Sequence, residues 1–279
     1  MKKSAVTHGF VLKQSREIAE IKSTANVYLH EKSGAELIHL ANEDTNKVFC
    51  IAFKTIPEDD TGCPHILEHS VLNGSKKFPA KSTFMELIKG SLHTFINAMT
   101  ASDMTLYPVA STNDKDFLNL MNVYMDAVLF PLIYEQPEIL YQEGWHYEMT
   151  HEQDELKIRG IVYNEMKGAF SSPDSIVSRR CQQVQFPDNA YGFESGGDPD
   201  AIPELSYEKF LDFHRKYYHP SNSRIFIYGD MDIDASLKLI NDDYLSKFDR
   251  DETLIEMPLQ APFKKARKQE MEYPIDEHE

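Results

Sequence analysis

The sequence predicts an α+β fold, in which a mainly antiparallel sheet carries helices on one face. Two observations lead to this prediction. Short segments rich in β-branched and aromatic residues are bounded by polar turns, which is typical of strands. Segments with apolar residues at helical spacing lie between them, without the regular strand–helix alternation that a parallel sheet requires. A chain of 279 residues, 41% of them hydrophobic, is long enough to bury a substantial core around such a sheet.

The predicted strands occupy residues 35–40, 48–53, 105–110 and 224–228. The first two are separated by the polar turn 42–46, which favours direct pairing of neighbouring strands. The fourth follows His219-Pro220-Ser221-Asn222, a sequence that interrupts the preceding helix. Strand pairs joined by short turns indicate antiparallel pairing.

Three helices are predicted around these strands. Residues 114–130 form the clearest one, with Asn113 as its N-cap and Pro131 as its end. Ser206 can cap a second helix, whose apolar residues face a core, and residues 234–248 form the last. The core positions at helical spacing are Phe117, Met121, Tyr124 and Val128 in the first helix, and Phe210, Leu211 and Phe213 in the second.

The chain shows no internal repeat and no low-complexity stretch. We therefore expect residues 1–262 to form one domain. Residues 263–279 are strongly charged and end without a stop signal, which indicates a linker or a cut edge that leads to further domains.

Composition excludes several classes of function. A net charge of −16 argues against nonspecific nucleic-acid binding, which needs a surplus of Lys and Arg, although it could attract basic peptides. No stretch approaches the length of an apolar membrane span, and no signal-peptide pattern follows the N-terminus. Three cysteines are too few for a disulfide framework. A reducing compartment, the cytoplasm, is therefore expected.

Residues 65–69 read His-Ile-Leu-Glu-His, which predicts a zinc centre. The segment Thr61-Gly62-Cys63-Pro64 marks the start of a short helix and Asn73-Gly74 its end. His65 and His69 are four residues apart, so both imidazoles project from one helical face and can reach one ion. Glu68 lies beside them and can take a proton from a water that the metal activates.

A catalytic zinc site needs a third protein ligand, and Glu165 is the best candidate. Its neighbours Ile161, Val162, Met166 and Phe170 can anchor a helix against a core while Glu165 faces the ion. Spacing alone does not select it. The nearby alternatives that stay open are Glu143, His146, Glu148, Glu152 and Glu155.

The wider sequence around these residues resembles the insulinase (pitrilysin, inverzincin) zinc metallopeptidases, and specifically their presequence-protease and falcilysin branch. The similar segments are residues 61–72, 87–98, 107–112, 142–148 and 164–168, in the order of the family. The resemblance implies that His65, His69 and Glu165 are the ligands of Zn²⁺ and that Glu68 is the general base. It also implies a fold unit used four times in a long chain, whose two halves close around a peptide; this chain would hold the first unit only.

The resemblance further implies that Asn97, Ala98, Met99 and Thr100 form an edge strand that binds substrate. An extended peptide would add to this edge through main-chain hydrogen bonds, which hold unfolded peptides with weak sequence specificity. From the residues alone, a strand in the interior of the sheet is equally compatible. The expected partners are unfolded peptides and the C-terminal half of the full-length enzyme, with no nucleic acid and no membrane.

The function expected from these observations is a zinc-dependent endopeptidase that hydrolyses internal bonds of unstructured, presequence-like oligopeptides. The isolated chain is expected to cleave slowly, because further groups that stabilise the oxyanion come from the C-terminal half in relatives. One alternative is a noncatalytic structural or partner subunit of the same fold, which would lack at least one of the four site residues. A hydrolase of small molecules is a second.

Four other residues invite weaker interpretations. Cys63 is expected to be a buried thiol that acts as a small hydrophobic group, although its position near His65 also suggests a redox switch. His93 and His146 could orient a ligand or a substrate. Trp145, the only tryptophan, is expected to anchor the core.

Overall fold

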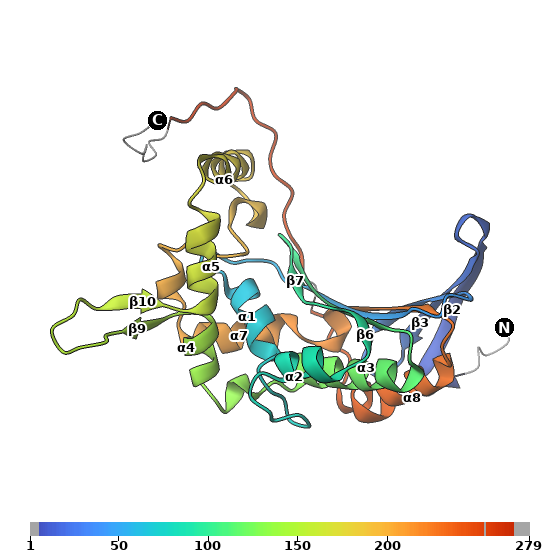
Figure 1. Cartoon of the computed structure of the whole chain (residues 1–279). Coiled ribbons are helices and arrows are strands. Elements are labelled where there is room, and N and C mark those ends of the chain that lie inside the picture. The colour runs from blue at the N-terminus through green and yellow to red at the C-terminus, as the bar shows by residue number, and fades with distance from the viewer. Residues whose placement is uncertain (1–5, 254, 271–279) are drawn as a thin grey trace.

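One large sheet forms the centre of the computed structural model, which describes residues 6–253 and 255–270 (Figure 1). Its strands are β1 (Val6–Thr7), β2 (Phe10–Ile18), β3 (Ser23–His30), β4 (Glu36–Ala41), β5 (Lys47–Lys54), β6 (His93–Ile96), β7 (Met99–Thr100), β8 (Met104–Ser111) and β11 (Ser223–Gly229). They follow the order β1-β2-β3-β4-β11-β5-β8-β6, and β7 also pairs with β8. All pairs are antiparallel except β4 with β11. The predicted fold class is confirmed.

Seven of the eight α-helices of the described chain fall into two groups, and α2 (Thr83–Gly90) belongs to neither. The seven are α1 (Cys63–Val71), α3 (Asp114–Leu129), α4 (Glu138–Glu143), α5 (Ile161–Ala169), α6 (Pro173–Gln185), α7 (Tyr207–Tyr217) and α8 (Ile233–Asp243). Figure 1 shows α1, α3, α7 and α8 on one face of the sheet, and α4, α5 and α6 in a column at one end. Strands β9 (His146–Glu148) and β10 (Lys157–Arg159) form a separate hairpin that projects from this column.

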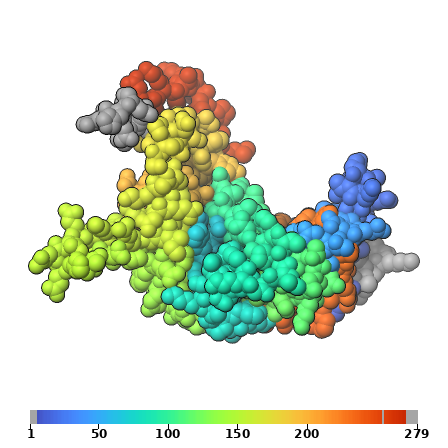
Figure 2. All heavy atoms as spheres, in the orientation of Figure 1, coloured from blue at the N-terminus to red at the C-terminus, as the bar shows by residue number. Residues whose placement is uncertain are grey.

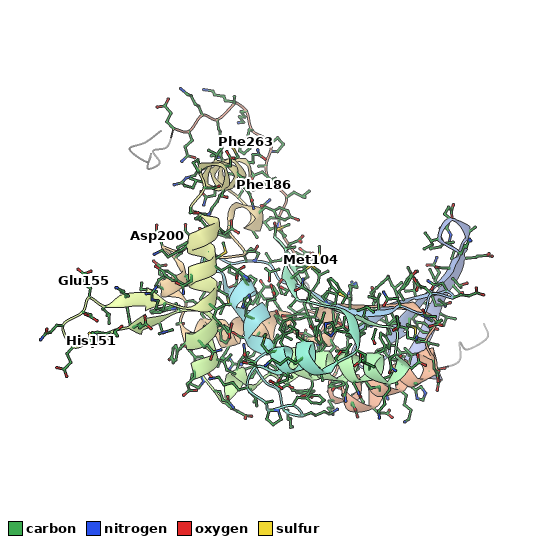
Figure 3. The ribbon with its side chains drawn as sticks, viewed as in Figure 1. Met104, His151, Glu155, Phe186, Asp200 and Phe263 are labelled. Carbon is green, nitrogen blue, oxygen red and sulfur yellow. The ribbon has the colours of Figure 1, made fainter. Side chains whose placement is uncertain are left out.

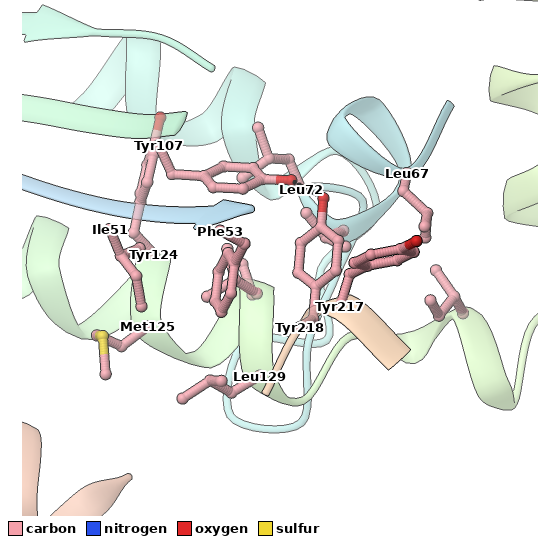
Figure 4. Close-up of a cluster of buried hydrophobic side chains, with 14 of the residues drawn as sticks. Ile51, Phe53, Leu67, Leu72, Tyr107, Tyr124, Met125, Leu129, Tyr217 and Tyr218 are labelled. Atoms are coloured by element: carbon pink, nitrogen blue, oxygen red, sulfur yellow. Dashed lines mark hydrogen bonds between the residues drawn. The ribbon is translucent and has the colours of Figure 1, made fainter. Parts of the chain in front are cut away.

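The core lies between the sheet and the helices on its covered face. In β5, Phe49, Ile51 and Phe53 alternate with less buried residues, because successive side chains of a strand point to opposite faces. Tyr107 of β8 and Tyr124 of α3 belong to the same cluster and are fully buried (Figure 4). The helices therefore rest on a continuous apolar surface that fixes their positions.

The strong local signals of the sequence are confirmed. The strands predicted at 35–40, 48–53, 105–110 and 224–228 are β4, β5, β8 and β11, each within one residue at either end. Asn113 caps α3 by accepting a hydrogen bond from the amide of Asp116, and Ser206 caps α7 in the same way through Lys209. Helix α3 ends at Leu129, one residue before its predicted end and two before Pro131.

The predicted last helix is too long. Helix α8 ends at Asp243 and only a 3₁₀ turn, Leu245–Lys247, follows it. Tyr244 leaves the helical conformation, with φ −131° and ψ −74°, and its ring is fully buried. Its hydroxyl donates a hydrogen bond to the carbonyl of Asn122, 2.7 Å away. Tertiary burial of this tyrosine therefore overrides the helical pattern of the sequence.

The segment 97–100 lies at the edge of the sheet, where β6 and β7 each pair only with β8 in the described chain. It is not one continuous strand, because Pro108 of β8 lies opposite Asn97 and has no N–H to donate. The amide of Asn97 still donates to Pro108 O, 3.2 Å away. The Tyr124 hydroxyl donates to Asn97 O at 3.1 Å and so takes the place of the missing strand bond.

Beyond residue 248 the described chain continues without a helix or strand of its own. Phe263 lies near α6 (Figure 3), and it lines a groove with that helix together with residues 265–269. The division at residue 262 stays a prediction. In the described residues, every helix is too short or too polar to cross a membrane.

Candidate metal centre

Helix α1 carries the His-Ile-Leu-Glu-His sequence and is almost completely buried. Eight of its nine residues are buried, and only His69 is partly exposed. The helix begins after Gly62, which has φ +69° and lies so close to Gly197 that a Cβ atom would be 2.6 Å from its Cα. Pro64 occupies the first turn, as predicted, but Thr61 does not cap the helix, because its hydroxyl donates to Asp59 instead. Helix α1 is therefore held from all sides.

His65, His69 and Glu165 bring one ligand atom each within 4.8 Å of one another. A single Glu165 carboxylate oxygen lies 3.7 Å from His65 Nε2 and 3.8 Å from His69 Nε2. The two imidazole rings are nearly perpendicular, at 81°, so their Nε2 atoms converge from different directions. These three residues surround one point that an ion could occupy.

The other ring nitrogen of each histidine, Nδ1, points away from Glu165 and contacts an oxygen of the protein. His65 Nδ1 lies 3.1 Å from the carbonyl oxygen of Gly196, and His69 Nδ1 lies 3.3 Å from the carboxylate of Glu143. Both partners are acceptors, so each Nδ1 donates its proton and each Nε2 presents a lone pair toward Glu165. This tautomer is the one that a metal site requires.

The electrostatics of the centre are dominated by carboxylates. Burial lowers the pKa of His69, but the hydrogen bond to Glu143 and the negative charges of Glu68, Glu143 and Glu165 outweigh it, so the pKa is raised overall. The same negative field attracts a cation. A divalent metal at the point between the ligands would therefore be favoured by charge as well as by geometry.

Glu68 lies next to the ligands and is 8% exposed. Its carboxylate accepts a hydrogen bond of 2.7 Å from the Thr100 hydroxyl on the edge strand β7. The sequence predicted that Thr100 would bind substrate; the structure shows that its hydroxyl contacts Glu68. The edge strand and the carboxylate next to the ligands are therefore directly connected.

Helix α5 delivers Glu165, and a close backbone contact sets its position. A Cβ atom on Gly160, which precedes α5, would lie 1.9 Å from the carbonyl oxygen of Gly144 at the end of α4. Val162 and Met166 are buried, as predicted, whereas Ile161 is 45% exposed, against the prediction that it anchors the helix. Glu165 itself is half exposed. The candidate third ligand therefore lies on a helix that is packed on one side only.

The loop that supplies Gly196 is held by an ion-pair cluster. Arg179 of α6 contacts Asp60 at 3.0 Å and Asp198 at 2.6 Å, and Glu194 lies 3.9 Å away. Asp60 also accepts the amide of Glu194 at 2.8 Å. This cluster ties α6 and the glycine loop to the segment that precedes α1, and so supports the acceptor of His65.

A pocket of about 360 Å³ opens beside Glu68 and His69. Its remaining walls combine apolar side chains with three amides, one hydroxyl and one carboxylate: Leu72, Asn73, Ser82, Phe84, Met85, Asn97, Ala98, Gln142, Glu143 and Ile161. Asn97 and Ala98 belong to the sheet edge, so the pocket joins the edge to the metal centre. The space can accept one side chain of an extended chain lying on the edge.

The structure brings together the four residues that the sequence placed at the centre. Of the alternative ligands, Glu143 lies behind His69, 3.3 Å from its Nδ1, and the others lie elsewhere. Glu148, Glu152 and Glu155 belong to the projecting hairpin, and Figure 3 shows Glu155 and His151 at its exposed tip. His146 contacts the Tyr141 carbonyl oxygen and His93 contacts the Ser91 hydroxyl, so neither reaches a ligand.

Glu143 and Gly196 hold the histidines instead, and the sequence did not assign them this role. The Gly-Gly pair at 196–197 was the only local signal for a tight loop.

Two further sequence predictions agree with the structure. Cys63 is buried, and burial raises the pKa of its thiol well above the usual value. Trp145 packs against the core, and its Nε1 donates to Leu205 O at 3.1 Å.

The donor set fits zinc. Two neutral imidazole nitrogens and one carboxylate oxygen are the three protein ligands of one well-known type of catalytic zinc site. The hydrogen bonds on both Nδ1 atoms add the outer support that such ligands usually have. The residues present could therefore hold the metal that the motif predicts.

Two sequence models of known domains match the chain. The model described as insulinase (peptidase family M16) matches residues 56–162, which contain α1. The model described as the peptidase M16 inactive domain matches residues 204–278. Strands β6, β7 and β8 lie within the first match and β11 within the second, whereas β1 to β5 precede both.

Individual proteins are similar over nearly the whole chain. Protein HypA of Clostridium perfringens is 53% identical over 278 residues, which is 100% of this chain and 29% of that protein. Presequence protease 1, chloroplastic/mitochondrial, of Arabidopsis thaliana is 52% identical over 86% of this chain and 22% of its own length. The mitochondrial presequence protease of Mus musculus is 45% identical over 93% of this chain and 25% of its own length. The chain thus spans about a quarter of the length of these relatives.

A solved structure supports the same relationship at the level of fold. The crystal structure of pitrilysin superposes with a TM-score of 0.67 over 90% of this chain and 26% of that one, at 18% sequence identity. The matches in sequence identify the chain as a member of the insulinase (M16) peptidase family, in the presequence-protease branch.

Proposed function

We propose that this chain forms the zinc-binding part of a metalloendopeptidase that hydrolyses internal bonds of unstructured peptides. The convergence of His65, His69 and Glu165, with Glu68 beside them, is the observation that carries the proposal. The complete set of four residues argues against a noncatalytic subunit of the same fold. Similarity to proteins named presequence proteases supports targeting-type peptides as substrates.

The chemistry divides between the ion and the side chains. Zinc held by the three ligands would polarise the scissile carbonyl and acidify a water. Glu68 accepts a proton from that water while the water oxygen forms a bond to the carbonyl carbon. Glu68 then gives the proton to the peptide nitrogen as the carbon–nitrogen bond breaks. Thr100 holds the Glu68 carboxylate in place through these steps.

The substrate would lie along the sheet edge formed by β6 and β7. This edge is unpaired in the described chain, so its free main-chain groups can pair with an extended peptide. Asn97, Ala98, Met99 and Thr100 would contact it, and the pocket beside Glu68 would take one side chain. Main-chain pairing explains how peptides of different sequence could be accepted.

We further propose that the isolated 279-residue chain cleaves slowly. It spans 22–29% of the length of its relatives, and Glu165 is half exposed on the side where further protein could close the site. Hydrolysis of an unstructured peptide by these residues alone, at a rate typical of enzymes, would contradict this.

Zinc content tests the proposal directly. The purified chain should hold one zinc per molecule, measured by elemental analysis after dialysis. Glu165→Gln should lose it, whereas Glu68→Gln should retain it, since Glu68 is not a ligand. Absence of zinc from the wild-type chain would overturn the proposed centre, and full retention in Glu165→Gln would mean that another residue is the third ligand.

A cytoplasmic location is also proposed, on the basis of three free thiols, Cys50, Cys63 and Cys181. Several relatives are named as mitochondrial or chloroplastic proteins. Fractionation of cells that express the natural protein would decide between these compartments.

A further inference from the structure

Glu143 is a buried carboxylate whose one basic partner in the described chain is His69. It is 4% exposed, and no Lys or Arg of the described residues forms an ion pair with it. A buried negative charge is costly unless other groups compensate it. Three hydrogen-bond partners compensate the buried carboxylate: His69, Asn73 and Gln142.

The three partners enclose both oxygens of the carboxylate. Oε2 lies 3.3 Å from His69 Nδ1, and Oε1 accepts from Asn73 Nδ2 at 2.9 Å and from Gln142 Nε2 at 3.0 Å. Asn73 also donates to the carbonyl oxygen of His69, 3.2 Å away. Asn73 therefore connects the backbone of His69 to the carboxylate that binds its ring, and the ring has little freedom to turn.

The position of Glu143 in the chain adds to this restraint. Glu143 is the last residue of α4, and the next residue, Gly144, makes the close contact with Gly160 that positions α5. The contact between Gly144 and Gly160 thus fixes the positions of two carboxylates. Glu143 lies on the Nδ1 side of His69 and Glu165 on its Nε2 side. A shift of α4 would move both.

We propose that Glu143 is a positioning residue of the metal centre, which fixes the ring and the tautomer of His69 and so sets the affinity for zinc. The inference rests on the proposed function, because it requires the centre to hold a divalent metal. Glu143 contacts the outer nitrogen of His69 and is not itself a ligand.

The two histidines are supported unequally. His65 donates to a neutral backbone carbonyl, whereas His69 donates to a carboxylate that carries a full negative charge. Charge-assisted hydrogen bonds are stronger than neutral ones. The charge on Glu143 should therefore contribute to metal affinity beyond its role in holding the ring.

Two substitutions separate these contributions. Glu143→Gln keeps an oxygen that can accept from His69 but removes the charge, and it should weaken zinc binding about 10-fold. Glu143→Ala removes both, and should weaken it about 100-fold, in the range measured for such outer partners. Zinc dissociation constants are measured by competition with a chromophoric chelator.

Glu148→Gln is the matched control. Glu148 is an exposed glutamate on β9 that pairs with Arg159 at 2.9 Å, away from the ligands. Its substitution should leave zinc affinity unchanged. Asn73→Ala provides a second variant in case Glu143→Ala fails to fold, and should weaken zinc binding less than Glu143→Ala does, since Glu143 itself remains.

The outcomes distinguish the two proposals. If the wild-type chain binds no zinc, the proposed function fails. If the wild-type chain and Glu148→Gln bind zinc and the folded Glu143→Gln and Asn73→Ala variants bind it within twofold of the wild type, the role of Glu143 is overturned. Circular dichroism of the metal-free variants verifies that they are folded.

Discussion

Helices α1 and α5 both direct candidate metal ligands to the same point, yet they are held in opposite ways. Helix α1 is buried on nearly every side and its His65 is 9% exposed. Helix α5 is packed through Val162 and Met166, and its Glu165 side chain is 54% exposed. Figure 2 shows that α5 belongs to a column that stands beside a hollow in the molecular surface.

This difference indicates that the two helices have different roles in the site. The buried helix holds the pair of imidazoles and Glu68 in a fixed arrangement, which favours preorganised chemistry. The position of Glu165 on the more exposed helix depends on the contact between Gly160 and Gly144 and on the packing of Val162 and Met166. Substitution of Glu68 in the first region should therefore affect catalysis without loss of the metal, whereas substitutions at the Gly160 contact should affect stability and metal binding together.

The largest effect is expected from Glu68→Gln, which removes the proton acceptor from the buried side. The ratio kcat/KM for an unstructured peptide should fall by about 10²–10⁴-fold, the usual contribution of a general base. It is measured in a chain extended to the length of the presequence proteases. Zinc content should not change. Unchanged turnover would show that Glu68 is not the base.

The contact of Gly160 with Gly144 is tested by Gly160→Ala. The new Cβ atom would collide with Gly144 O, and φ is +155°, so the free energy of unfolding should fall by about 3 kcal/mol. Zinc affinity should fall with it.

Gly168→Ala on the same helix is the control for Gly160→Ala. Its Cβ would meet nothing within 4 Å, and a glycine-to-alanine change inside a helix should stabilise by up to about 1 kcal/mol. Urea titrations measure both variants. Equal free energies of unfolding for Gly160→Ala and Gly168→Ala would show that the contact of Gly160 with Gly144 does not position α5.

Acid should lower the free energy of unfolding through His214, a buried histidine of α7. His214 of α7 stacks on Tyr218, and burial lowers its pKa to about 4. The unfolded chain takes up this proton near the ordinary pKa of 6.5, so the unfolded state binds more protons between pH 6.5 and 4. Stability should therefore fall as pH decreases through this range, by roughly 3 kcal/mol at most.

The comparison for this prediction is His214→Gln, which carries no titratable group. Its free energy of unfolding should depend less steeply on pH than that of the wild type. Burial also lowers the pKa values of His30, His39 and His219, so part of the wild-type slope should remain in the variant. Parallel profiles for the two proteins would show that His214 does not contribute.

The smallest effect is expected at Thr100, which connects the buried side to the sheet edge. Thr100→Val should lower kcat about 10-fold by releasing the Glu68 carboxylate, with little change in KM. Thr100→Ser should restore the rate, because it restores the hydroxyl. A rise in KM at constant kcat would instead favour the role in substrate binding that the sequence resemblance implies.

The sequence by itself determined the elements with strong local signals. The spacing of the apolar residues predicted α3, and its bounds followed from Asn113 and Pro131 to within one residue. The spacing of His65 and His69 placed both imidazoles on one helical face. These features depend on neighbours within a few turns, so the residue order contains them. The resemblance to a known family added the choice of Glu165, which spacing alone left open.

Only the tertiary structure decided the rest. Strands β2 and β3 were not predicted, because much of β2 is exposed and its residues show no clear apolar alternation. The end of α8 depends on the burial of Tyr244, and the break between β6 and β7 depends on Pro108, which lies in another strand. The role of Glu143 arises from contact with a helix more than 70 residues earlier in the chain. Such contacts join segments distant in sequence, and local patterns carry no information about them.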